Sequence, residues 1–459
     1  MDPMPALRRR RGGRAWGRTA IALALAALAV RPDGPLYACT GGDMVPLGSD
    51  KYFPMLYGDR PTVQQLADLG RRMFSDPSLS VSGRQSCASC HDPAHGYGPP
   101  NALAVQHGGP HMDRAGFRNT PSLTYLHAPI PFTEHFFESE PVLGRDDQGP
   151  TGGRTWDGRV DNGHDQALMP LTDPNEMANA DVDAIAERLK SAPYAAALRE
   201  AVNPPEGDVF DDPQAVVAWA TIALETFEQS PADFHPFTSK YDAWLKDAAT
   251  LTPREARGLR LFNDIKKGNC ASCHVSTPRN MQSPFPLFTD FGYAALGVPR
   301  NAALPANADP SFHDLGLCGP LRKDLAKKTE LCGRFRVPSL RNVALRQRFF
   351  HNGAIGSLRD AVAFYATRDV TPRRWYAKDV EGRVQRFDDL PAAYRANVET
   401  GVPFKPLPGG RPRLSPREID DIVAFLGTLT DGWRPPAPPR DLSPASSRDA
   451  RGTRAAAGR

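Results

Sequence analysis

The hydrophobic positions of the chain predict helices far more often than strands. Leu66, Leu69 and Met73 recur at helical spacing, and they follow Thr62 and Gln65, which have the spacing of a capping box. Such a pattern is typical of an amphipathic helix that buries one face. We therefore expect a capped helix to begin near residue 62.

The same arrangement returns in the second half of the chain. The segment Thr252–Glu255 is again a capping box, here with proline at the first helical position, and Leu259 and Phe262 follow at helical spacing. The sequence LGRRMFSD at 69–76 resembles RGLRLFND at 257–264. The chain therefore contains a weak internal duplication, with one amphipathic helix opening each copy.

Further periodic segments predict helices at 181–202 and 213–229, and Ser415–Glu418 is a third capping box. It precedes an apolar helical face made of Ile419, Ile422, Val423 and Leu426. Strand signals are few, and 46 prolines and 39 glycines among 459 residues predict long ordered loops. The expected fold is mainly α and rich in loops.

The N-terminus has the layout of a signal peptide. A basic stretch from Arg8 to Arg18 precedes an apolar run of twelve residues at 19–30, which is too short to span a bilayer comfortably. We expect export and cleavage near Ala38, so that residues 1–38 form a signal peptide. Cys39 could carry a lipid anchor, or it could follow an ordinary cleavage site.

Charge is distributed unevenly along the chain. The net charge of +4 includes about +5 in residues 1–38 and +4 in residues 434–459, which leaves about −5 for the segment between them. This middle segment has no basic footprint, so nothing there predicts nucleic-acid binding. From residue 434 the chain is rich in Pro, Arg, Ala and Ser without periodicity, which predicts a disordered basic tail.

The strongest chemical signal is the motif C-A-S-C-H, which occurs at 87–91 and again at 270–274. C-x-x-C-H is the attachment signature of c-type haem, in which two thiols bond one porphyrin and the histidine reaches the iron. A zinc ribbon or a redox dithiol is the alternative reading, but two identical copies in an exported chain favour haem. The predicted haem-binding residues are Cys87, Cys90, His91, Cys270, Cys273 and His274.

Two further cysteines, Cys318 and Cys332, lie fourteen residues apart. In an oxidising compartment they most simply form a disulfide, and two unpaired thiols are the alternative.

With the motifs in place, the chain resembles the bacterial di-haem cytochrome c peroxidase family, including its MauG-type members. The resemblance runs from about residue 60 to 430. The matching segments are 69–76, 86–93, 118–123, 156–159, 166–170, 175–177, 337–344, 350–353 and 358–365.

The resemblance implies two cytochrome-c-like haem domains packed face to face. The N-terminal domain would span 39–235 and hold the peroxidatic haem, and the C-terminal domain would span 236–433 and hold the electron-transfer haem. Glu176 matches the family's catalytic glutamate and Gln166 its companion. Pro170 matches a residue of the same distal pocket, and Trp156 matches a tryptophan placed between the haems.

The second haem carries the informative departure from the family pattern. Where classical members place a methionine ligand this chain has Tyr365, as in the MauG type. A phenolate is a hard anionic ligand that favours oxidised iron, whereas a thioether favours reduced iron. Leu358, Ala361, Val362 and Tyr365 share one helical face, so a plain core tyrosine is the alternative. Met281 and His351 are reserve ligands.

Two features are left undecided by the sequence, namely the sixth ligand of the first haem iron and a calcium site between the haems. His107 or His111 could supply a ligand to the first iron, or that iron could be open, which we favour. Asn119 matches a ligand of a calcium ion between the haems. The other ligands would be backbone carbonyls of Arg346–Arg348, and two arginines beside a divalent cation are unfavourable.

These observations predict a periplasmic peroxidase with two covalently bound haem c groups. It would use hydrogen peroxide to form high-valent haem iron and then oxidise a reducing partner, either an electron-donor protein or a protein substrate. The first alternative is an ordinary cytochrome c peroxidase supplied with electrons by a small cytochrome or cupredoxin. An alternative of another class is a non-catalytic di-haem electron carrier, which would need no distal acid such as Glu176.

Overall fold

A computed structural model of the chain describes residues 37–40, 43–46, 61–137, 147–202, 204, 206–278 and 283–435. Two units are present, Met1–Leu56 and Tyr57–Arg459. The first contains an antiparallel hairpin of β1 (Tyr37–Thr40) and β2 (Asp43–Pro46). The rest of the predicted signal peptide, the side chain of Cys39, the reserve ligand Met281 and the tail beyond residue 435 lie outside the described residues.

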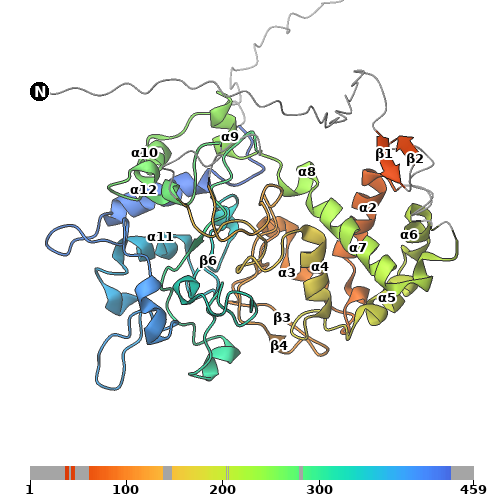
Figure 1. Cartoon of the computed structure of the whole chain (residues 1–459). Coiled ribbons are helices and arrows are strands. Elements are labelled where there is room, and N and C mark those ends of the chain that lie inside the picture. The colour runs from red at the N-terminus through yellow and green to blue at the C-terminus, as the bar shows by residue number, and fades with distance from the viewer. Residues whose placement is uncertain are drawn as a thin grey trace, which may run out of the picture. The chain divides into compact units, whose positions relative to one another are not determined.

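The second unit is built mainly from helices joined by long loops (Figure 1). Its helices are α2 (Val63–Phe74), α3 (Cys87–Cys90), α4 (Gly163–Thr172), α5 (Val182–Ser191), α6 (Ala195–Ala201), α7 (Pro213–Glu228), α8 (Pro231–Phe234), α9 (Lys240–Leu245), α10 (Pro253–Asn263), α11 (Leu358–Thr367) and α12 (Pro416–Gly427). Its strands are β3 (His107–Gly108), β4 (Arg114–Ala115), β5 (Tyr293–Ala294) and β6 (Phe335–Arg336), which form the antiparallel pairs β3–β4 and β5–β6. The expectation of a mainly α, loop-rich fold is confirmed for these residues.

Each half of this unit is organised around one tightly packed helix pair. Helix α2 packs on α7, and α10 packs on α12. A glycine lies at the closest approach in both pairs: a Cβ on Gly70 would lie 2.0 Å from the Ala223 carbonyl oxygen, and one on Gly258 would lie 2.0 Å from that of Asp421. The duplication seen in the sequence is therefore a repeated helix crossing.

The buried apolar side chains form two main cores, one on each helix pair. One draws on residues between Leu66 and Phe234, and the other on residues between Tyr241 and Leu429. In Figure 1 the helices of the first core, α2 and α4–α7, lie on one side of the unit, and α10–α12 lie on the other. Leu66, Leu69 and Met73 belong to the first core, as their spacing predicted.

The helix-start signals are confirmed where the structure describes them. Thr62, Thr252 and Ser415 each form the capping box expected of them. The segment predicted as one helix over 181–202 is instead two, α5 and α6. The prediction overlooked Pro193, because proline disfavours helical geometry in the residue before it, and Ala192 is accordingly extended.

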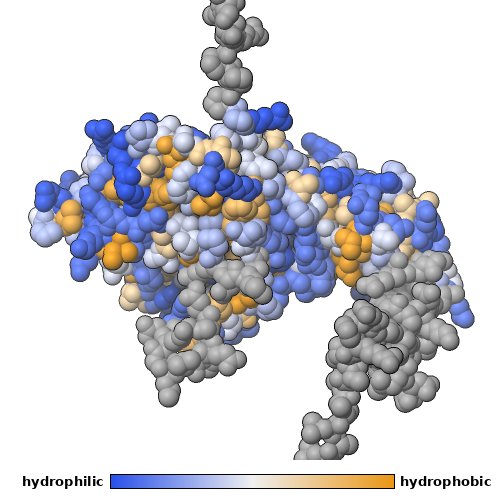
Figure 2. Space-filling model, turned by 90° about the horizontal axis from the view of Figure 1, so that it is seen from above, coloured by the Kyte–Doolittle hydropathy of each residue, from blue (hydrophilic) through white to orange (hydrophobic). Residues whose placement is uncertain are grey.

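Cys318 and Cys332 form a disulfide with a Cα–Cα distance of 4.9 Å, inside a small third apolar cluster. This confirms the pairing predicted from the spacing. Within the described residues no helix is long and apolar enough to cross a membrane. On the face shown in Figure 2, apolar residues are interspersed with hydrophilic ones.

Candidate functional site

Both C-A-S-C-H motifs fold into a single tight turn. Residues 87–90 form α3, and Cys270–Ser272 form a 3₁₀ turn. In each motif the histidine N–H donates to the carbonyl of the first cysteine at 2.8 Å. Such a turn places cysteines three positions apart on one side. All four thiols are free of disulfides, so they remain available to bond a porphyrin.

The motif histidines are oriented by the same device in both halves. The ring Nδ1 of His91 lies 3.1 Å from the Tyr97 carbonyl oxygen, and that of His274 lies 3.0 Å from the Phe288 carbonyl oxygen. Because a carbonyl only accepts, Nδ1 must carry the hydrogen, and Nε2 keeps its lone pair. Burial lowers the pKa of each histidine to about 4, so both are neutral at pH 7. A metal-binding histidine needs both properties.

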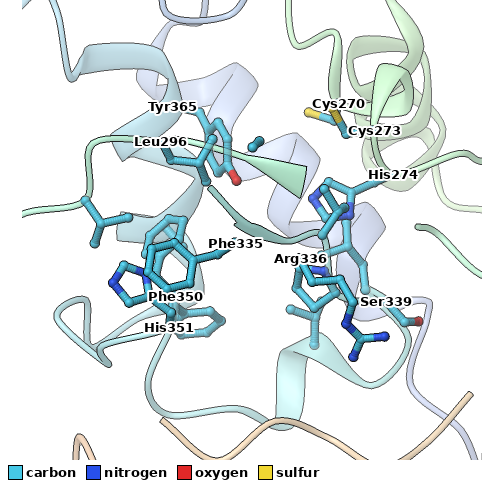
Figure 3. Close-up of a pocket in the computed structure, with 18 of the residues that line it drawn as sticks. Cys270, Cys273, His274, Leu296, Phe335, Arg336, Ser339, Phe350, His351 and Tyr365 are labelled. Atoms are coloured by element: carbon cyan, nitrogen blue, oxygen red, sulfur yellow. The ribbon is translucent and has the colours of Figure 1, made fainter. Parts of the chain in front are cut away.

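A cavity of about 590 Å³ lies beside the second motif. Cys270, Cys273 and His274 line one side of it, and Tyr365 from α11 lies opposite with its hydroxyl pointing inward (Figure 3). Within the described residues the Tyr365 hydroxyl makes no hydrogen bond, and burial together with the nearby thiols raises its pKa above the usual value near 10. Phe404 stacks on its ring at 5.3 Å.

These residues fit a haem group. Such a group requires two cysteines outside any disulfide, a neutral histidine whose Nε2 keeps its lone pair, and a cavity within the roughly 300–1,000 Å³ range of cofactor sites. The reserve ligand His351 also lines this cavity, but its ring is covered by Phe335, stacked at 3.5 Å, and its Nε2 lies 3.5 Å from an Asp389 carboxylate oxygen. Within the described residues the His351 Nε2 makes no hydrogen bond, so His351 and Tyr365 both bring an unbonded donor to this cavity, and it is the Tyr365 hydroxyl that faces the motif.

On the first motif's side, Glu176 lies in the turn that follows α4. Its N–H donates to the Asp173 carbonyl at 3.0 Å, and its own carbonyl accepts from Gly109 at 2.7 Å. Neighbouring Gly108 cannot be replaced without a clash, because a Cβ there would lie 2.8 Å from the Glu176 Cα. The hairpin β3–β4 therefore fixes the backbone that carries this carboxylate.

Desolvation by the surrounding protein raises the Glu176 pKa to about 7, and the nearby Asp173 adds to the effect while Arg159 opposes it, although the side chain itself is exposed. The carboxylate is close enough to the Cys87 and Cys90 thiols to raise their pKa values as well. A carboxyl that titrates near neutrality can both accept and release a proton at pH 7.

The other residues predicted around the first motif are distributed over two elements. Gln166 and Pro170 are four residues apart on α4, so both are on one side of that helix, and both are half-buried. His107 and His111 belong to the β3–β4 hairpin and its tip, and both are exposed. The structure brings this hairpin to Glu176 but shows no contact that assigns either histidine a role.

Trp156 lies at the junction of the two halves. Its indole Nε1 donates to the Asn119 carbonyl at 2.7 Å, and the side chain is buried and lines the cavity that holds Tyr365. Asn119 in turn donates through its N–H to the His351 carbonyl at 2.6 Å and through Nδ2 to the Ala104 carbonyl at 2.8 Å. One buried asparagine thus connects segments from both halves of the chain.

The expected calcium ligands are already engaged by a cation of the chain itself. The Arg346 guanidinium donates to the Asn119 side-chain oxygen, to the Thr120 carbonyl at 2.9 Å and to the Arg348 carbonyl at 3.3 Å. Among the described residues no group of three or more His, Cys, Asp or Glu side chains could hold a metal ion. The residues present therefore do not fit a calcium ion at Asn119.

The sequence reasoning missed a second arginine at the junction. Arg118 bonds Asp157 at 2.6 Å and both carboxylate oxygens of Asp314 at 2.7 Å, and all three side chains are nearly buried. Asp157 follows Trp156 directly, so this network fixes the tryptophan's position. The arginine was visible in the sequence, but its partner Asp314 is 196 residues away and no local pattern joins them.

The whole chain was compared with known protein families and with individual proteins. A family model described as di-haem cytochrome c peroxidase matches residues 64–250. Methylamine utilization protein MauG of Paracoccus denitrificans is 35% identical over 397 residues, which cover 81% of this chain and 90% of that protein. Cytochrome c551 peroxidase of Pseudomonas aeruginosa is 28% identical over 390 residues, which cover 84% of each chain.

Among solved structures, the diheme peroxidase BthA from Burkholderia thailandensis is similar with a TM-score of 0.69 and 42% sequence identity. The match covers 81% of this chain and 87% of that one.

Proposed function

The chain belongs to the di-haem cytochrome c peroxidase family, and we propose that it is a MauG-like member that uses hydrogen peroxide to oxidise a reducing partner. Its two C-x-x-C-H motifs account for the two haem c groups of the family. The bound haem iron supplies the redox chemistry towards peroxide. The side chains described above supply proton transfer, positioning and the choice of axial ligand.

The observation that carries the proposal is the position of Tyr365. Its hydroxyl faces Cys270, Cys273 and His274 across the cavity and has no other partner among the described residues. Burial raises its pKa, so the phenol would give up its proton to solvent only where a strong local positive charge, such as a metal ion, stabilised the phenolate. An anionic oxygen ligand would hold the second haem at a low reduction potential.

Glu176 is the proposed acid–base group on the first haem's side. With a pKa raised to about 7, it can accept a proton from hydrogen peroxide and return that proton to the oxygen that leaves as water. Gln166 and Pro170 on α4 would shape the same pocket. Trp156, fixed through Asn119 and the neighbouring Asp157, would lie on the path between the haems.

A redox titration of the purified protein, followed by its visible spectra, tests the proposal. We expect ascorbate to leave the second haem oxidised, because a histidine–tyrosinate haem has a low potential. A second haem that titrates at a high potential, as a histidine–methionine haem does, would contradict the MauG-like assignment and leave the family membership untouched.

An ordinary cytochrome c peroxidase is the second candidate. It is supported by the match to cytochrome c551 peroxidase over 84% of the chain. Steady-state turnover with a reduced small cytochrome or cupredoxin would favour it. A non-catalytic carrier would instead show two six-coordinate low-spin haems and little reaction with peroxide.

We place the protein in the periplasm. A disulfide such as that between Cys318 and Cys332 is typical of an oxidising compartment, and the basic and apolar N-terminal segment predicts export. A lipid anchor at Cys39 stays a prediction, which the mass of the mature N-terminal peptide would test.

A further inference from the structure

Arg346 is a half-buried cation without a counter-ion among the described residues. It follows the 3₁₀ turn Val343–Leu345 and extends its side chain towards the N-terminal half. Its three hydrogen bonds within the described part of the chain all go to neutral oxygens, those of Asn119, Thr120 and Arg348. Burial lowers its pKa to about 10, and it therefore stays protonated at neutral pH.

The oxygens that Arg346 binds have the chemistry of a cation site. One comes from an asparagine side chain and two come from backbone carbonyls, which are oxygen donors of the kind that bind calcium. A calcium ion would need these oxygens at about 2.3–2.6 Å, and the guanidinium is already among them. No salt bridge of the described residues neutralises Arg346, so the chain supplies its own positive charge at this place.

The same group holds the junction together. Arg346 fixes the Asn119 side chain, and Asn119 holds Trp156 through its carbonyl and the His351 segment through its N–H. The guanidinium also lies beside the loop that orients His91, because a Cβ on Gly98 would lie 3.3 Å from the Arg346 Nη1, and Gly98 directly follows Tyr97, whose carbonyl binds the His91 ring. One side chain therefore acts on the first haem site, on the indole and on a segment lining the second cavity.

We propose that the Arg346 guanidinium takes the place of a calcium ion between the two haem sites, so that this chain needs no bound divalent cation there. Arg346 is then a positioning residue, which orders Asn119 and Trp156 and adds a fixed positive charge between the haems. This inference holds for either candidate function, because both use the same two haem sites.

The metal content of the wild-type holoprotein is the first test. The protein is equilibrated with calcium chloride, passed through gel filtration and analysed by elemental mass spectrometry before and after treatment with EGTA. We expect well under one calcium per chain and haem spectra that EGTA leaves unchanged. One calcium per chain whose removal alters the spectra would overturn the proposal.

The second test compares R346T with R348T. The first removes the guanidinium and leaves the oxygens, whereas the second removes a neighbouring guanidinium whose hydrogen bond within the described residues goes to the Ala102 carbonyl. We expect R346T to shift the midpoint potentials of both haems and to bind calcium at least tenfold more tightly than wild type by calorimetry, with added calcium partly restoring the potentials. R348T should match wild type in both measurements.

The measurements test the positioning role of Arg346 and its equivalence to calcium separately. Potentials that are the same in R346T and R348T would overturn the positioning role. Shifted potentials without calcium binding would keep that role and overturn the equivalence to calcium. If R346T fails to fold, R346K serves instead, because it keeps the charge but cannot span the three oxygens. Potentials near wild type in R346K would support the role of the fixed positive charge. Potentials clearly shifted from wild type in R346K would overturn that role.

Discussion

The two halves hold their motif histidines alike and differ in what they place opposite them. His91 and His274 each direct Nδ1 at a backbone carbonyl, at 3.1 and 3.0 Å. Near the first motif, a turn after α4 carries Glu176, whose pKa is raised to about 7. Opposite the second, α11 carries the Tyr365 hydroxyl. The shared orientation of the two histidines suits haem attachment in both halves. The different groups, Glu176 and Tyr365, suit proton transfer in the first half and iron ligation in the second.

The difference also shows how a duplicated unit can diverge without losing its packing. The helix pairs α2–α7 and α10–α12 keep the glycine contact that sets their approach. The functional side chains come from segments outside these pairs, namely the turn after α4, the hairpin β3–β4 and helix α11. Those segments can change without disturbing the shared core.

Removing either haem-attachment motif should have the largest effect of the changes considered. Cys87→Ser with Cys90→Ser should remove one haem mass and abolish the reaction with peroxide, because Glu176 lies on that side. Cys270→Ser with Cys273→Ser should also remove one haem mass but leave peroxide binding at the first haem. Intact-mass spectrometry and stopped-flow spectra measure both effects. Equal peroxide reactivity in the two variants would contradict the division of labour.

Glu176→Gln should give the next largest effect. The amide keeps the shape but cannot accept a proton, so peroxide cleavage should slow by about 10²–10⁴-fold. In the wild type the rate should rise with pH through about 7, because the carboxylate form is the base and it is favoured above the pKa. Stopped-flow rates across pH 5–9 test this.

The variant Glu187→Gln, on the exposed side of α5, is the matched control and should keep both the rate and its pH dependence. A Glu176→Gln rate within threefold of wild type would make Glu176 a bystander.

Tyr365→Met tests which group binds the iron of the second haem. Exchanging a phenolate for a thioether should raise that haem's potential by about 0.1–0.3 V, part of the roughly 0.8 V that axial ligands span. Peroxide should still bind at the first haem, whose pocket is unchanged. Tyr365→Phe removes the oxygen without adding a ligand and should leave the second haem five-coordinate by its spectrum. Identical spectra in wild type and Tyr365→Phe would mean that the tyrosine only packs.

Local signals predicted more of the structure than long-range ones did. The capping boxes at Thr62, Thr252 and Ser415 and the disulfide depend on residues close in sequence, and they formed as expected. The helix break at Pro193 was also a local signal, but the apolar periodicity around it outweighed it in the prediction.

The junction between the halves could not be predicted in the same way. Arg346 contacts Asn119 from 227 positions away, and only the folded chain brings them together. The sequence showed that two arginines suit calcium poorly, but not that one of them fills the site. Roles taken from the family resemblance, such as those of Gln166 and Pro170, stay predictions until the variants are measured.

The smallest expected effect tests whether the halves are coupled in folding. Gly70→Ala and Gly258→Ala each place a Cβ 2.0 Å from a backbone carbonyl oxygen, so the helices must separate slightly. Overpacking of this kind lowers the free energy of unfolding by about 1–3 kcal/mol. Gly427→Ala in α12 has open space around the new Cβ and should change that free energy by less than about 1 kcal/mol.

The number of unfolding transitions decides whether the two halves unfold together or independently. Arg118 joins Asp157 to Asp314, and Arg346 joins Asn119 to the C-terminal half, so the halves share buried polar contacts that neither can keep alone. Breaking them would leave buried charges unpaired, which is costly. We therefore expect one unfolding transition in guanidinium, shifted equally by Gly70→Ala and Gly258→Ala and followed identically by helix content and haem absorbance. Two transitions, each moved by only one variant, would show that the halves fold independently.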